Sequence, residues 1–385
     1  MEIPDVQYAR SGDVAIAYQV VGEGATDILF ARGVSGELLS MWEHPLIARH
    51  VAGLAEIGRL LMLDKRGTGL SDRMREAATL EARMDDLGAV MDAVGSQRAV
   101  LWASMESARL AIVFAATYPE RTSGPVLLEP WIRGRRTPDY PWAPSDEEWR
   151  HQLAEVAERW GRRDYFEELT HEWAPDGADD PEFVDWFVTH MRRGMSPGAA
   201  VALFRAIRDS DVADVLGAVR VPTMVMFKPE ERGPAEYVAD RVSKCELVEL
   251  GRLRGIYTWI DDETHAASMA AIGGLSSAWA GHRSPTACSR PSCSRTSSAP
   301  ARVPRRSATA PGATSCARTT RKCGAGSRSS AARSSMWPAT ASLLRSTAPA
   351  GRSGARVRSV TTWRPSTSSS APASTRANAS GWTES

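Results

Sequence analysis

Residues 98–121 read RAVLWASMESARLAIVFAATYPER, and this stretch decides the expected architecture. Residues 99–102 form a short apolar run, which is typical of a strand covered on both faces. Residues 106–117 have a helical apolar pattern, and Pro119 marks the end of that helix. The turn between them, at 103–107, has the pattern small-x-Met-x-small. A strand, a tight turn and a helix in this order predict one unit of an α/β sheet.

Short strands and helices alternate over most of the first 282 residues, with short links between them. Such alternation predicts a mostly parallel sheet that helices cover on both faces. We expect a hairpin at 6–10 and 14–21, strands at 27–31, 59–64, 125–128, 223–227 and 246–250, and helices at 46–57, 80–94, 235–242 and 262–279.

The pattern changes at about 131–215, where the sequence is helical, acidic and rich in tryptophan. We interpret this part as a helical cap inserted over the ends of the strands. Its tryptophans either pack between the cap helices or line an apolar pocket. They are Trp142, Trp149, Trp160, Trp173 and Trp186.

Four sequence segments carry a resemblance to a known family. DKRGTGLSD at 64–72 and FAATYPER at 114–121 are similar to segments of α/β-hydrolases. With MWEHP at 41–45 and MDDLGAVMDAVGS at 84–96, they resemble the hydrolase-like domains found N-terminal to class III adenylate cyclases. The resemblance covers about residues 1–282. It implies an α/β-hydrolase fold, but a fold alone does not establish a function.

The resemblance also implies a catalytic triad, whose positions are degenerate here. The elbow nucleophile falls on Met105, whose thioether forms no acyl-enzyme by the usual route. The acid falls on Glu231 or its neighbour Glu230, and the histidine position falls on Gly255. Nucleophile and base are both missing, and neither would work without the other. If only these groups are missing, Met105→Ser with Gly255→His should restore some ester hydrolysis.

Further site residues follow from the same resemblance. It places the oxyanion-hole amides at Val34 and Glu106. Ser104 and Ser107 flank the elbow and are fallback nucleophiles, although a shift of one residue turns a side chain away from the oxyanion hole. We interpret His265 as a surface histidine. No metal site and no cofactor is expected.

Residues 283–385 differ in composition from the rest of the chain. They hold 17 of the 47 basic residues and one acid, Glu384, and consist mainly of Ser, Ala, Arg, Thr and Pro. This predicts a disordered basic tail, which can bind nucleic acid through phosphates. We favour a cyclase domain translated out of frame. Codons that could encode residues 286–298 and the segment around Met336 can be read in one shifted frame. The resulting sequences resemble segments of class III cyclase catalytic domains.

These observations predict a catalytically degenerate α/β-hydrolase-like domain over 1–282. It would sense a ligand, or regulate an adenylate cyclase whose catalytic domain is lost. The alternatives are an active, esterase-like hydrolase with a non-standard nucleophile and, less favoured, nucleic-acid binding through the tail. The expected partner is a small apolar ligand or ester in the cleft under the cap. The N-terminus resembles no signal peptide and no run suits a membrane span, so we expect a cytoplasmic protein without a membrane partner. The oligomeric state is left open.

Overall fold

The structure, a computed structural model, describes residues 2–34, 36–74, 77–280 and 357–359. Within these residues, nine strands form one sheet in the order β1-β2-β4-β3-β5-β6-β7-β8-β9. The pairs that β2 forms with β1 and β4 are antiparallel, and the other pairs are parallel, which confirms the expected mostly parallel sheet. The strands are β1 (Gln7–Ser11), β2 (Val14–Val21), β3 (Asp27–Ala31), β4 (Arg59–Leu63), β5 (Ala99–Ser104), β6 (Thr122–Leu128), β7 (Thr223–Phe227), β8 (Cys245–Glu249) and β9 (Val357–Ser359).

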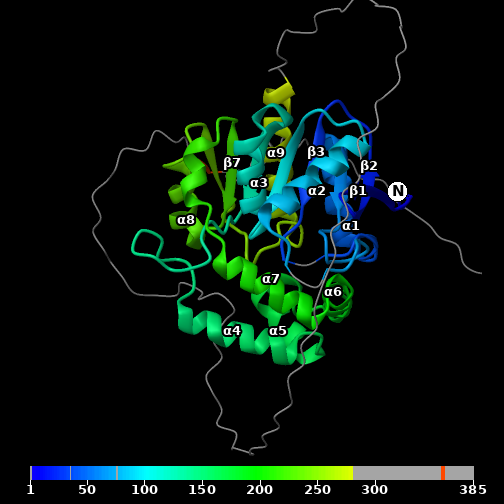
Figure 1. Cartoon of the computed structure of the whole chain (residues 1–385), viewed down its shortest axis with the longest axis vertical. Helices are drawn as coiled ribbons and strands as arrows, with labels where there is room; N and C mark the ends of the chain where they lie inside the picture. Colours follow the sequence, from blue (N-terminus) through cyan, green and yellow to red (C-terminus); the bar gives the residue numbers. More distant parts are fainter. Residues whose placement is uncertain (1, 35, 75–76, 281–356, 360–385) are drawn as a thin grey trace, which may run out of the picture.

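Helices cover both faces of this sheet, as Figure 1 shows. One face packs against α2 (Leu80–Ala93), α3 (Ser107–Thr117) and α8 (Arg232–Ala239), and the other against α1 (Pro45–Ile57) and α9 (Asp262–Ala280). Successive side chains of a strand point to opposite faces, so each strand supplies both layers of the core. In the central strand β5, for example, Val100 packs on the side of α1 and Leu101 on the side of α3.

A helical cap is inserted between β6 and β7, as the sequence predicted. It consists of α4 (Asp146–Arg159), α5 (Arg163–Trp173), α6 (Pro181–Gly194) and α7 (Pro197–Asp209), which lie below the sheet in Figure 1. Ser145 and Glu148 form a capping box that fixes the start of α4. Short 3-10 helices occupy Leu39–Trp42, Pro119–Arg121, Pro175–Gly177, Ala213–Ala218 and Pro229–Glu231.

Both roles proposed for the cap tryptophans occur. Trp149 and Trp160 are buried inside the cap, where their indole nitrogens donate to the carbonyl oxygens of Gly134 (2.5 Å) and Met195 (3.1 Å). Trp173 and Trp186 instead line a cavity beneath the cap.

The expectations for the C-terminal segment fall almost entirely outside the described residues. These are the disordered tail, nucleic-acid binding and the out-of-frame cyclase domain. The described part of that segment is β9, which pairs in parallel with β8 and was not predicted. Among the helices of the described residues, none is long and apolar enough to cross a membrane.

Asp64, directly after β4, organises the loops at the carboxyl end of the sheet. Its fully buried carboxylate forms an ion pair with Arg32 and accepts hydrogen bonds from the amides of Leu38 (3.3 Å) and Leu70 (2.8 Å). The loop can wrap this closely because Gly69 has φ +50°, and a Cβ there would overlap the Asp64 carboxylate.

We predict that Asp64→Asn destabilises the fold by about 3 kcal/mol or more, because removing one partner leaves the buried Arg32 without a counter-charge. Urea unfolding monitored by tryptophan fluorescence measures the change. Asp240→Asn, at an exposed position, is the matched control and should change the free energy of unfolding little. An equal effect of the two substitutions would contradict this role of Asp64.

Candidate functional site

The turn between β5 and α3 has the strained geometry of a nucleophile elbow. Met105 has φ 53°, in the left-handed region that non-glycine residues rarely occupy. Its amide donates to the carbonyl of Leu128 (3.0 Å), and its carbonyl accepts from the amide of Trp131 (3.1 Å). Two backbone hydrogen bonds to the segment at the end of β6 therefore hold the strained residue in place.

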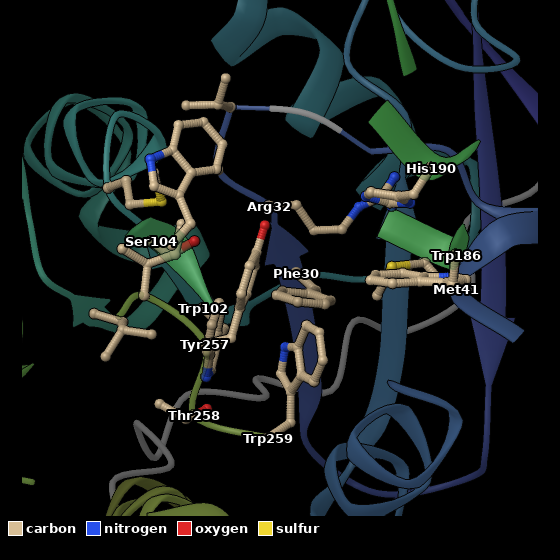
Figure 2. A pocket seen from close by; sticks show the side chains of 16 residues that line it. Phe30, Arg32, Met41, Trp102, Ser104, Trp186, His190, Tyr257, Thr258 and Trp259 are labelled. Atoms are coloured by element: carbon tan, nitrogen blue, oxygen red, sulfur yellow. The ribbon is translucent and has the colours of Figure 1, made fainter. Parts of the chain in front are cut away.

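A cavity of about 50 Å³ lies beside Met105, under the cap. Its walls come from the ends of β3, β5 and β6, from the cap helices α5 and α6, and from the loop between β8 and α9 (Figure 2). Six of the lining side chains are large aromatic groups: Phe30, Trp102, Trp173, Trp186, Tyr257 and Trp259.

Several buried polar groups of this lining have no hydrogen-bond partner among the described residues. They include the indole nitrogens of Trp102 and Trp173, the hydroxyl of Thr258, and Nε and Nη1 of Arg32. The indole and guanidinium groups are donors only, and a buried donor without a partner is costly. The lining therefore combines apolar side chains with buried donors that lack a partner among the described residues.

Lys65 contacts both predicted oxyanion-hole residues, Val34 through its carbonyl (3.4 Å) and Glu106 through its carboxylate. Lys65 Nζ donates to the carbonyl of Gly33 (2.5 Å), next to Val34, and pairs with the Glu106 carboxylate (2.6 Å). Val34 lines the cavity, and Glu106 follows Met105 directly. Their role as oxyanion donors stays a prediction.

The two fallback serines differ in position. Ser104 lines the cavity. Ser107 is fully buried, and its hydroxyl donates to the carbonyl of Arg32 at 2.5 Å. Ser107 thus fastens α3 to the loop after β3, which argues against a role as nucleophile, and this fallback stays a prediction.

The predicted histidine position cannot accept a side chain without rearrangement. Gly255 has φ +78°, and a Cβ there would overlap the carbonyl oxygen of Trp173 at the end of α5. That carbonyl also accepts a hydrogen bond from the amide of Ile256 (2.8 Å). The cap thus packs directly on the loop that would carry a catalytic base.

The histidines near the site do not replace the missing base. His190 lines the cavity, but Figure 2 shows it on the side opposite Ser104, and its Nδ1 is bound to the Ser40 hydroxyl (2.7 Å). His265, expected to be a surface histidine, is partly buried. Its Nε2 is buried, and its ring packs against that of His50, with 5.6 Å between the centroids.

An acidic pair with a lysine occupies the region of the predicted acid. Glu231, half-buried after β7, lies outside the cavity lining, and burial raises its pKa. The sequence analysis missed Glu129, which follows β6 directly and has φ 46°. Lys228 Nζ lies 3.3 Å from the Glu129 carboxylate and 3.3 Å from the carbonyl of Gly255. Burial raises the pKa of Glu129 to about 7, although Lys228 opposes this shift.

No family model and no curated protein matches the sequence. Solved structures do match. An enol-lactonase from Burkholderia xenovorans has a TM-score of 0.58 and 20% identity, covering 70% of this chain and 99% of its own. An esterase from Thermogutta terrifontis has a TM-score of 0.58 and 21% identity, and the match covers 71% of this chain and 99% of the esterase. A bromoperoxidase from Bacillus anthracis has a TM-score of 0.59 and 18% identity, and the match covers 70% of this chain and 99% of the bromoperoxidase.

At these identities the likeness shows the fold. The chain has the α/β-hydrolase fold, as its sequence motifs predicted. The comparisons contain no link to an adenylate cyclase, so that narrower part of the resemblance stays a prediction.

We predict that Met105→Ser combined with Gly255→His restores no ester hydrolysis, contrary to the expectation from sequence, because the new side chain collides with Trp173. The stability of single variants tests the cause. Gly255→Ala should lower the free energy of unfolding by about 1 kcal/mol or more. Gly251→Ala is the control, since nothing lies within 4 Å of a Cβ there. Hydrolysis by the double variant would show that the loop can move away from the cap.

We predict that Glu129 makes the folded state less stable as the pH rises from about 4.5 to about 7. In this range the unfolded carboxyl group has lost its proton while the buried one keeps it. Each unit by which burial raises the pKa corresponds to about 1.4 kcal/mol. Thermal unfolding of Glu129→Gln should therefore show a gain in stability at pH 8 that disappears towards pH 4.5. Glu56→Gln, at an exposed position, serves as control; a gain independent of pH would contradict the assignment.

Proposed function

We propose that this protein binds a small, mainly apolar molecule that carries a hydrogen-bond acceptor, and that it does not hydrolyse it. The observation that carries this proposal is Met105, which occupies the strained elbow and lines the cavity. The backbone geometry that presents a nucleophile is thus kept, while the side chain offers an apolar, polarisable surface.

The surroundings of the elbow support binding without catalysis. A serine hydrolase needs a proton acceptor within hydrogen-bond reach of its nucleophile. Here the base position is Gly255, closed by Trp173, and His190 lies across the cavity from Ser104. Met105 at the nucleophile position and Gly255 at the predicted base position both argue against hydrolysis, since each removes one half of the usual nucleophile–base pair.

The ligand class follows from the walls of the cavity. Aromatic rings bind an apolar or aromatic body. The unpartnered indole groups of Trp102 and Trp173 favour an oxygen acceptor such as a carbonyl. A cavity of about 50 Å³ holds only a few heavy atoms, so a larger ligand requires the cap to move outwards. Because the sequence resembles cyclase-associated domains, we propose that this binding serves regulation.

Ester hydrolysis with Ser104 as nucleophile is the second candidate. Ser104 lines the cavity beside the elbow, and solved neighbours are described as an esterase and a lactonase. The likeness to these neighbours supports this candidate at least as well as the first. The geometry argues against it, because no imidazole lies beside the Ser104 hydroxyl within the described residues.

Phenyl acetate separates the two candidates, because it combines an aromatic ring, a carbonyl acceptor and a cleavable ester. It is larger than the cavity, so its binding also requires the cap to move outwards. We predict saturable quenching of tryptophan fluorescence without release of phenol above the buffer rate, and no labelling by a fluorophosphonate probe. Trp102→Phe removes the indole donor but keeps a ring, and should weaken binding by about 0.5–1.5 kcal/mol.

Trp142→Phe is the matched control, since Trp142 lies outside the cavity lining. Release of phenol that Ser104→Ala abolishes would establish the second candidate and reject the first. Quenching that Trp102→Phe and Trp142→Phe change equally would remove the assigned binding site.

A further inference from the structure

Three cations surround one buried carboxylate behind the elbow. Glu106, 1% exposed, pairs with Lys65 Nζ (2.6 Å) and with Arg83 Nη2 (3.1 Å). Arg109 lies one helical turn further along α3, is 1% exposed, and interacts electrostatically with Glu106. These four groups carry an excess of two positive charges; Asp211, which also acts on Arg109, is itself paired with Arg133 (3.3 Å).

The hydrogen bonds of Arg109 do not compensate its charge. Its Nε donates to the carbonyl of Trp131 (2.6 Å) and its Nη1 to the carbonyl of Ile207 (2.7 Å). Burial lowers the pKa of Arg109 to about 10, so the guanidinium stays protonated at neutral pH. Its Nη2 and the Nε of Arg83 have no partner among the described residues.

A hollow of about 250 Å³ adjoins this cluster. Arg83, Arg109 and Glu106 line it, together with the end of α7 and the N-terminus of α2 at Thr79 and Leu80. In Figure 1, α7 lies between the sheet layer and helices α4 and α5, beneath α2 and α3. The positive end of the α2 dipole adds to the charge of the two arginines.

The other carboxylate of the lining does not neutralise the cluster. Asp209 is half exposed and is held by Arg135 (2.8 Å) and Arg208 (2.7 Å). A buried cation without a counter-charge is costly. The hollow therefore favours an anion that approaches Arg83 and Arg109.

We propose that this hollow binds a phosphate group, either as inorganic phosphate or as a phosphate monoester. A phosphate carries close to two negative charges at neutral pH, which matches the excess of the cluster. Its oxygens also point in several directions, so arginines on different elements can donate to it at once. The hollow shares no lining residue with the aromatic cavity, so this proposal stands independently of the proposed function.

Calorimetric titration of the full chain with inorganic phosphate tests the proposal, with sodium chloride at equal ionic strength as the blank. We expect saturable phosphate binding that Arg83→Gln weakens about tenfold, which corresponds to about 1.4 kcal/mol. Arg98→Gln is the matched control, because Arg98 is an exposed arginine at the opposite end of β5 and should leave the affinity unchanged.

Glu106→Gln should change the phosphate affinity in the opposite direction. It removes the negative charge of the cluster, so phosphate should bind more tightly and should raise the melting temperature more than in the unchanged protein. Because Arg83→Gln and Glu106→Gln each leave a buried charge without its partner, titration of the unchanged protein keeps the proposal testable if a variant fails to fold. Phenyl phosphate distinguishes the two sources: competition with phosphate indicates a site open to monoesters, and no competition indicates the free ion.

The absence of saturable binding would overturn the proposal, as would equal affinities of the unchanged protein, Arg83→Gln and Glu106→Gln.

Discussion

The left-handed backbone at Met105 is the constraint on which the rest of the site depends. Such a conformation costs a non-glycine residue about 1–3 kcal/mol, and it persists only where the surrounding structure enforces it. Here hydrogen bonds with Leu128 and Trp131 enforce it, because β5 and β6 pair in register up to their ends. The turn sets the direction of α3. Met105 thereby faces the aromatic cavity, and the next residue, Glu106, joins the cluster with Lys65 and Arg83.

The cap packs directly on the loop that carries Gly255, the predicted histidine position. Gly255 lets the loop after β8 approach the end of α5 so closely that the carbonyl of Trp173 bonds to the amide of Ile256. A histidine at this position needs the space that this contact fills. The same end of α5 supplies the Trp173 ring to the cavity, so closing the base position also builds a wall of the binding site.

Some buried charged groups are paired with a group of opposite charge, and other buried polar groups have no partner among the described residues. Asp64 with Arg32, and Glu106 with Lys65, are pairs with additional backbone hydrogen bonds, and they stabilise the loops around the elbow. Within the described residues, some buried polar groups have no partner, and several of these lie around the aromatic cavity and beside Arg109. Because folded proteins satisfy most of their buried polar groups, these unpartnered groups motivate the two proposed ligand sites.

Local pattern in the sequence determined the strands, the helices, the inserted cap and the position of Met105, because each depends on residues close together in the chain. The proposed loss of the triad rests on the same kind of local evidence, since fixed spacing from the elbow and the strands assigns its positions. Contacts between distant segments decided the rest. The carbonyl of Trp173 closes Gly255, the carbonyl of Arg32 engages Ser107, and Arg83 and Arg109 meet only because α2 and α3 pack side by side. No periodicity in the sequence encodes such pairings, because they arise from the order of strands in the sheet and from the burial that this order imposes.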